Sequence, residues 1–223
     1  MKQIPLPIGT AAARSFDNFA TGANAATLAH LRSLRPGAAP VYLWGPTGSG
    51  KTHLTQGLIG CMQADGVRCA SYGAEVAAPW IGSEPCGIVV IDDCERLDAE
   101  QQSCAFSLFV QAASTGATIV AAGRLPPVDL ALREDLRSRL GWGYVMAVHA
   151  LSEHEARAEL RRDADRRGIL LTDEVMEYLL TRFARDLKSL FDLLDRLDQF
   201  SMAQQRSVTV ALLKQMLAQE PAA

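Results

Sequence analysis

Residues 41–52 read Val41-Tyr42-Leu43-Trp44-Gly45-Pro46-Thr47-Gly48-Ser49-Gly50-Lys51-Thr52, and this stretch decides the fold. The first four residues are apolar and end at a glycine, which predicts a short buried strand. The last eight match the pattern G-x-x-x-x-G-K-[ST], and a helix is predicted to follow from Lys51 to Ala64. A glycine-rich turn between a strand and a helix is the context in which this pattern binds phosphate. The stretch therefore predicts a P-loop nucleotide-binding protein.

Each residue type in this loop has a physical reason to be there. Glycines let the backbone wrap so that successive N–H groups point at phosphate oxygens, and the following helix presents its positive end to the same anion. Lys51 is predicted to reach the outer phosphates, and the Thr52 hydroxyl is predicted to bind Mg²⁺. His53 follows directly and is expected to pack at the start of the helix rather than to act in catalysis. The predicted nucleotide-binding residues of this segment are Gly45, Pro46, Thr47, Gly48, Ser49, Gly50, Lys51, Thr52 and His53.

An acidic pair follows the most apolar segment of the chain. Residues 87–91 read Gly-Ile-Val-Val-Ile, which predicts a central parallel strand buried on both faces, and Asp92 and Asp93 come next. A carboxylate at the end of a buried strand beside the P-loop strand can hold Mg²⁺, so Asp92 is predicted to share the metal with Thr52. Asp93 is predicted to orient the attacking water, where many ATPases use Glu. The alternative is that the pair caps the helix after the strand.

The first two thirds of the chain predict a layered α/β fold. Further strands are predicted at residues 69–72 and 117–122, and further helices at 24–34 and 99–114. Strands that alternate with helices indicate a parallel sheet with helices on both faces.

Beyond residue 150 the pattern becomes helical throughout. Ser152 and Glu155 fit a capping box at a helix start, Gly168 is a natural helix end, and Thr172 is predicted to cap the next helix, which runs to about Phe183. Leucines from residue 187 onward recur at helical spacing, and a last helix is predicted to end near residue 217. We therefore predict a tail at residues 1–9, a three-layer parallel-sheet domain at 10–150 and a small all-helical lid domain at 151–223.

Composition limits the kinds of partner. The chain has 223 residues and a formal net charge of −3, which disfavours autonomous DNA binding through phosphate neutralisation. Its start lacks the apolar core of a signal peptide, and no apolar run approaches the roughly 18 residues that span a bilayer. We expect a cytoplasmic protein without a membrane partner.

Several segments resemble the DnaA family of replication initiators, whose nucleotide-binding domain has the AAA+ form of the P-loop fold. Phe16-Asp17-Asn18-Phe19 is similar to the segment that packs against adenine in that family, which implies that Phe16 contacts the nucleotide. Two further segments also match that family's motifs: the P-loop followed by His53, and Ile91-Asp92-Asp93. The resemblance covers nearly the whole chain from about residue 14. The family's helix-turn-helix domain has no counterpart here, so we expect no direct sequence-specific DNA binding.

Residues 136–143, Leu-Arg-Ser-Arg-Leu-Gly-Trp-Gly, resemble the arginine-finger segment of the same family. The resemblance implies that Arg139 is a catalytic residue offered in trans to the nucleotide of DnaA. A guanidinium beside the γ-phosphate stabilises charge in the transition state, which accelerates hydrolysis about 10³- to 10⁵-fold in comparable systems. Arg137 lies in the same segment and is the rival for this role.

The tail is similar to the sliding-clamp-binding peptide of the Hda family, the DnaA-related regulatory inactivators. Its predicted clamp-binding residues are Gln3, Ile4, Leu6, Pro7 and Ile8. Such an extended peptide suits a hydrophobic groove. The resemblance implies a negative regulator of replication initiation that binds ADP or ATP with Mg²⁺, binds the DNA-loaded clamp and stimulates hydrolysis of DnaA-bound ATP. It leaves a homodimer open.

Two positions depart from the family pattern. Residues 121–124 read Ala-Ala-Gly-Arg where the family has a polar sensor of the γ-phosphate, and Arg124 is a candidate substitute. Lys188 stands where the lid usually has a nucleotide-contacting arginine, so the bidentate fork is lost. We therefore expect weak or no intrinsic ATPase. The alternatives are an autonomous AAA+ ATPase such as a replicative helicase loader, working through Asp92 and Asp93, and a non-catalytic relative whose clamp-like tail is accidental.

Overall fold

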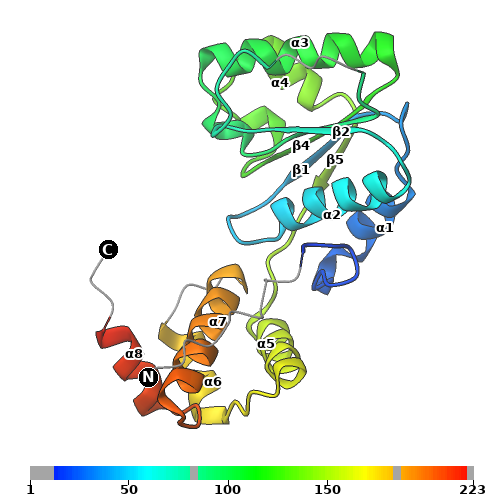
Figure 1. Cartoon of the computed structure of the whole chain (residues 1–223). Coiled ribbons are helices and arrows are strands. Elements are labelled where there is room, and N and C mark those ends of the chain that lie inside the picture. The colour runs from blue at the N-terminus through cyan, green and yellow to red at the C-terminus, as the bar shows by residue number, and fades with distance from the viewer. Residues whose placement is uncertain (1–12, 81–84, 183–186, 220–223) are drawn as a thin grey trace, which may run out of the picture. The chain divides into compact units, whose positions relative to one another are not determined.

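The computed structural model describes residues 13–80, 85–182 and 187–219, which form two compact units (Figure 1). The first unit is residues 13–150, and the second begins at Leu151. Each unit has its own hydrophobic core, so each is described by itself.

The first unit is built on a parallel sheet of five strands. The strands are β1 (Val41–Trp44), β2 (Cys69–Tyr72), β3 (Ile88–Ile91), β4 (Thr118–Gly123) and β5 (Tyr144–Ala147). Their order is β2-β3-β4-β1-β5, and all pairings are parallel. Trp44 pairs with Gly123, and Ile91 pairs with Ala121. The chain segments that leave β1, β3 and β4 therefore meet at the carboxyl edge of the sheet, where parallel α/β sheets bind ligands.

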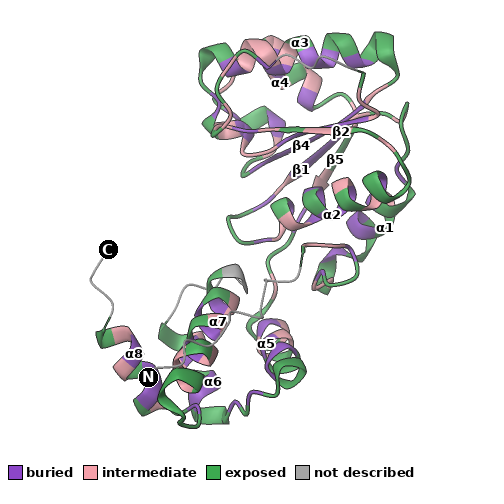
Figure 2. Ribbon diagram, in the orientation of Figure 1, coloured by how far each residue is buried: buried purple, intermediate pink, exposed green. Residues whose placement is uncertain are grey.

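Helices cover both faces of this sheet (Figure 1). They are α1 (Ala25–Ser33), α2 (Lys51–Ala64), α3 (Ala99–Thr115) and α4 (Glu134–Leu140). Strand side chains alternate between the faces: Leu43 packs in the core with α1 and α2, whereas Tyr42 packs in the core with α3 and α4. Figure 2 shows the central strands β1 and β4 coloured largely as buried. The predicted three-layer α/β fold is confirmed.

One strand of the sheet was missing from the sequence prediction. Strand β5 pairs with β1 and is the edge strand next to it. Its first two side chains, Tyr144 and Val145, are 54% and 42% exposed, so the segment lacks the continuous apolar run of a buried strand. The preceding Gly143 permits a close approach, because a Cβ there would lie 1.9 Å from the carbonyl oxygen of Pro40.

The second unit is helical, as predicted. Its helices are α5 (Glu153–Arg167), α6 (Asp173–Arg182), α7 (Leu187–Gln204) and α8 (Val210–Ala218). The predicted capping box is present: the Ser152 side chain accepts from the Glu155 N–H, and the Glu155 carboxylate accepts from the Ser152 N–H at 2.8 Å. Gly168 ends α5 with φ 71° in the left-handed region.

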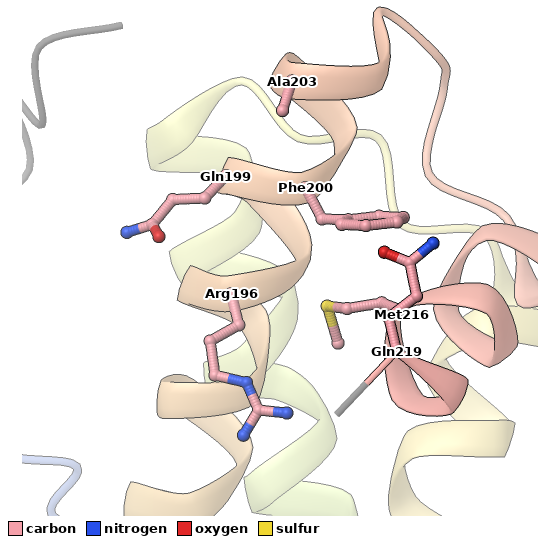
Figure 3. Close-up of a pocket in the computed structure, with 6 residues that line it drawn as sticks. All are labelled: Arg196, Gln199, Phe200, Ala203, Met216 and Gln219. Carbon is pink, nitrogen blue, oxygen red and sulfur yellow. The ribbon is translucent and has the colours of Figure 1, made fainter. Parts of the chain in front are cut away.

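A shallow hollow lies between α7 and α8. In Figure 3, it is lined by Phe200 from α7, Met216 from α8 and Gln219, the residue directly after α8. Its volume is about 350 Å³, and it contains none of the predicted site residues. Within the described part of the chain, no helix combines the length and apolarity needed to cross a bilayer.

Candidate functional site

The loop between β1 and α2 has the backbone geometry that phosphate binding requires. Gly48 and Gly50 have φ values of 79° and 98°, in the left-handed region where glycine carries no steric penalty. Helix α2 begins at Lys51 directly after Gly50, and no side chain caps it. The first N–H groups of α2 are therefore left for an anion at the positive end of the helix.

Lys51 is held inside the loop as a buried cation. Its side chain is 7% exposed, and its Nζ donates to the carbonyl oxygens of Gly45 at 2.8 Å and Pro46 at 3.0 Å. Burial lowers the pKa of Lys51, and the negative charges of Glu95, Asp92 and Asp93 oppose this shift. The ammonium group has neutral acceptors in the loop, so phosphate oxygens would be stronger partners for it.

Ser49 adds a second donor to the loop. Its hydroxyl oxygen is buried and has no hydrogen-bond partner among the described residues. A buried hydroxyl without a partner is costly. The loop therefore contains a donor that fits a ligand with oxygen acceptors.

The two predicted Mg²⁺ ligands lie together. Asp92 accepts a hydrogen bond from the Thr52 side chain and one at 2.9 Å from the Asp93 N–H. Burial raises the pKa of Asp92, and these two hydrogen bonds oppose the rise. One carboxylate and one hydroxyl beside a phosphate loop suit Mg²⁺, which keeps water and phosphate oxygens as its other ligands.

Asp93 has a different environment. Its φ is 51°, and its carboxylate pairs with the Arg96 guanidinium at 3.3 Å, with 41% of the side chain exposed. Helix α3 has its own cap, because the Asp98 side chain accepts from the Gln101 N–H in a complete capping box. The acidic pair therefore does not cap α3.

The segment predicted to contact adenine is anchored to α2. His53 Nε2 lies 2.9 Å from both the Ser15 carbonyl oxygen and the Asn18 side-chain oxygen. Phe16 is buried in the core with α1 and α2. Phe19 lies against the P-loop, since a Cβ at Gly50 would be 2.7 Å from its ring. Phe16 and Phe19 both belong to the segment that the resemblance places against adenine, and Phe16 is the one predicted to contact the nucleotide.

Glu95 is a further residue that the motifs did not identify. It lies in a short 3₁₀ helix, Cys94–Arg96, which begins directly after Asp93. Its side chain reaches the residue that follows β4. There its Oε2 accepts the Arg124 N–H at 3.2 Å. Arg124 itself is exposed. The available sequence signal was a third carboxylate two residues after the acidic pair.

Arg139 lies on α4 and stacks against an exposed aromatic ring. Its guanidinium carbon is 5.1 Å from the centroid of Trp142, whose side chain is 68% exposed. Leu136 and Leu140 bury the other side of α4 in the core. The side chain of Lys188 and the predicted clamp-binding residues Gln3 to Ile8 lie outside the described part of the structure.

Comparison with known sequences finds similarity to one protein family and to an individual relative. A family model described as "Hda, lid domain" matches residues 153–217. A *Haemophilus influenzae* protein described as an uncharacterized protein is 32% identical over 230 residues, a match that covers 97% of this chain and 98% of the relative.

Comparison with solved structures gives the same fold. Domain III of the *Thermotoga maritima* replication initiation protein DnaA matches with a TM-score of 0.74 at 20% identity, over 92% of this chain and 95% of that one. AMPPCP-bound DnaA from *Aquifex aeolicus* matches with a TM-score of 0.68 at 19% identity, over 86% of this chain and 68% of that one. At these identities the likeness shows the fold.

Proposed function

We propose, on the premise that this chain belongs to the Hda-like group of DnaA-related AAA+ proteins, that it binds an adenine nucleotide and promotes hydrolysis of the ATP held by DnaA. It would thereby act as a negative regulator of replication initiation. The observation that carries the nucleotide part is the preformed loop, in which Lys51 is buried against the carbonyls of Gly45 and Pro46 beside the Thr52–Asp92 pair.

The nucleotide would be ADP or ATP, with Mg²⁺. The N–H groups at the start of α2, the Ser49 hydroxyl and the Lys51 ammonium are the donors for its phosphates. Thr52 and Asp92 would hold the metal, which neutralises phosphate charge when bound. The *Aquifex aeolicus* relative in fold was solved with AMPPCP, which supports an adenine nucleotide in this site.

The position of Arg139 supports action on another protein's nucleotide. Trp142, which its guanidinium contacts, lies two residues before β5, and β5 begins beside the start of β1. The P-loop leaves the opposite end of β1. A four-residue strand rises about 13 Å, so the Trp142 segment and the chain's own phosphate loop lie at opposite edges of the sheet.

The sliding clamp would be the place at which this protein acts on DnaA. Residues 3–8 are proposed to bind the DNA-loaded sliding clamp as an extended peptide. This part of the proposal rests on the sequence of Gln3, Ile4, Leu6, Pro7 and Ile8.

The test is hydrolysis of ATP prebound to DnaA, measured with this protein and DNA-loaded clamp. Arg139→Ala is expected to lower the stimulated rate about 10³-fold or more, whereas Arg137→Ala is expected to stimulate nearly as well as the wild type. Both variants should bind ADP with unchanged affinity, because neither residue belongs to the phosphate loop.

Two results would overturn this assignment. Full stimulation by Arg139→Ala together with loss in Arg137→Ala would transfer the finger role to Arg137. Rapid ATP turnover by this protein alone, without DnaA and dependent on Asp92 and Asp93, would favour an autonomous AAA+ ATPase such as a helicase loader.

A further inference from the structure

Trp142 lies in a short turn between α4 and β5 whose backbone is held on both sides. Its own N–H donates to the Arg139 carbonyl oxygen at 3.2 Å, which ties the turn to the end of α4. On the other side, the Tyr144 N–H donates to the Pro40 carbonyl oxygen at 2.8 Å, and a Cβ at Gly143 would lie 1.9 Å from the same oxygen. The backbone therefore fixes the place from which the Trp142 side chain extends.

The Trp142 ring is not part of the core of this unit. Its side chain is 68% exposed, and neither hydrophobic cluster of the first unit contains it. A tryptophan is on average a highly buried residue, so core packing does not account for this one. Its contact is with a cation, because the Arg139 guanidinium carbon lies 5.1 Å from the ring centroid. A guanidinium at this distance over an indole face is attracted by the quadrupole of the ring.

Arg139 is held by this ring and not by an acid. Within the part of the chain that the structure describes, its guanidinium has no hydrogen bond or ion pair, and its contact is Trp142. A carboxylate partner would occupy N–H donors and would have to be displaced before the guanidinium could bind phosphate. A π face holds the guanidinium and leaves its positive charge and its five N–H donors available. This arrangement suits an arginine that acts on a phosphate brought by another protein.

The neighbouring Arg137 lacks such a contact. Among the described residues its side chain has no ring, acid or hydrogen-bond partner, and the residue four positions further on is Gly141, which has no side chain to offer. An arginine without a partner loses more side-chain freedom when it binds than one that is already held. The structure therefore distinguishes the two arginines of this segment, because Arg139 alone of the pair stacks on a ring.

We propose that Trp142 is a positioning residue for Arg139, and that its ring holds the guanidinium ready for the γ-phosphate of the ATP on DnaA. The inference rests on the proposed action on DnaA and assigns a second residue of this segment a part in it. Association of the two proteins would exclude water from the contact, and a cation–π contact is stronger out of water than in it. The ring should therefore act mainly on the rate of hydrolysis within the complex.

The experiment measures hydrolysis of ATP prebound to DnaA over a range of concentrations of the full chain, with DNA-loaded clamp present. Each titration gives a maximal rate and a half-saturating concentration. Trp142→Leu keeps an apolar side chain and removes the π face, so we expect a maximal rate about tenfold lower. Trp142→Tyr keeps an aromatic face and should remain within about threefold of the wild type. In both variants the half-saturating concentration should change less than the maximal rate.

Tyr144→Leu is the matched control. It removes an exposed aromatic ring two residues further along the chain, but this ring lies against His30, with the two centroids 4.4 Å apart, and not against an arginine. Its maximal rate should equal that of the wild type. Thermal unfolding of each variant, with and without ADP, checks that the fold and the nucleotide site are intact.

A second measurement tests the contact without DnaA. The side-chain Nε–H resonance of Arg139 in the NMR spectrum of the free chain can be assigned with Arg139→Lys. It should move in Trp142→Leu, because the ring current of the indole is lost, and it should keep its position in Tyr144→Leu.

Several results would overturn the inference. A wild-type maximal rate in Trp142→Leu, an equal loss in Trp142→Tyr or in Tyr144→Leu, or an unmoved Arg139 resonance would each do so. A normal maximal rate with a raised half-saturating concentration would also do so, because Trp142 would then serve docking. In all these cases a wild-type chain that stimulates hydrolysis leaves the proposed function standing. A wild-type chain that fails to stimulate DnaA would overturn both.

Discussion

Lys51 illustrates how a residue can be retained for binding at a cost to the free protein. Its ammonium is buried against two neutral carbonyl oxygens, and burial lowers its pKa. A charge in such a place is stabilised less than in water. Its hydrogen bonds to Gly45 and Pro46 also connect the end of the P-loop to its beginning. Under the proposed function, phosphate oxygens would replace these carbonyls as partners of the ammonium and would offset this cost.

Replacing Lys51 with methionine, which has a similar length and no charge, separates these two effects. Lys51→Met should leave the melting temperature of the nucleotide-free protein unchanged or slightly higher, because a buried charge is removed. It should also abolish stabilisation by ADP, which in the wild type amounts to about 2.7 kcal/mol at a ligand concentration 100 times the dissociation constant. Thermal unfolding with and without ADP measures both. Equal ADP stabilisation in wild type and variant would show that Lys51 does not bind phosphate.

Residues were predictable from sequence when their role depends on neighbours in the chain. The loop from Gly45 to Thr52 is recognised by the spacing of its residues, and Asp92 is recognised by its place directly after an apolar strand. The structure brings Thr52 and Asp92 together. Glu95 was not recognised, because its relevant contact is with Arg124, 29 residues further along the chain. The contact between Phe19 and Gly50 could not be predicted for the same reason, since it depends on the tertiary packing of the 15–19 segment.

Elements show the same division between local and long-range causes. Helices α3 and α5 begin at complete capping boxes, and the box at Ser152 was identified in the sequence. Strand β5 was not identified, because an edge strand needs few buried side chains and its place depends on pairing with β1. Its position also requires Gly143 beside Pro40, which no local pattern indicates.

Gly45, which lies between β1 and the rest of the P-loop, tests how closely the backbone must pack at this point. A Cβ at Gly45 would lie 2.1 Å from the backbone carbonyl oxygen of Val148, which cannot turn aside as a flexible side chain could. Gly45→Ala should therefore displace the loop, lower the melting temperature and weaken ADP binding. Circular dichroism melts and ADP titration measure the two effects.

Gly60 supplies the matched control for this substitution. It lies inside α2, and a Cβ there would meet nothing within 4 Å. Gly60→Ala should increase the free energy of unfolding by about 0.5–1 kcal/mol, because alanine favours the helix over glycine. Unchanged stability and ADP affinity in Gly45→Ala would contradict the argument that close backbone approach fixes the loop.

At the scale of the whole molecule, the proposed function divides the chain into parts with separate tasks. In this proposal the phosphate loop would bind nucleotide, Arg139 would act on DnaA and the tail would bind the clamp. A tether raises the effective concentration of the attached protein without changing its contacts at the second site. Losing the tether should therefore be remedied by more protein, whereas losing the finger should not.

Gln3→Ala combined with Leu6→Ala tests this distinction. At low protein concentration the double variant should stimulate hydrolysis of DnaA-bound ATP about 100-fold less than the wild type when DNA-loaded clamp is present. Stimulation should return as its concentration is raised, because Arg139 is intact. Arg139→Ala should stay inactive at every concentration. Lys2→Ala changes the same tail outside the predicted peptide and should behave as wild type. If the Gln3 and Leu6 variant matches the wild type at low concentration, the tail is not the tether, and the location of this protein must depend on another surface.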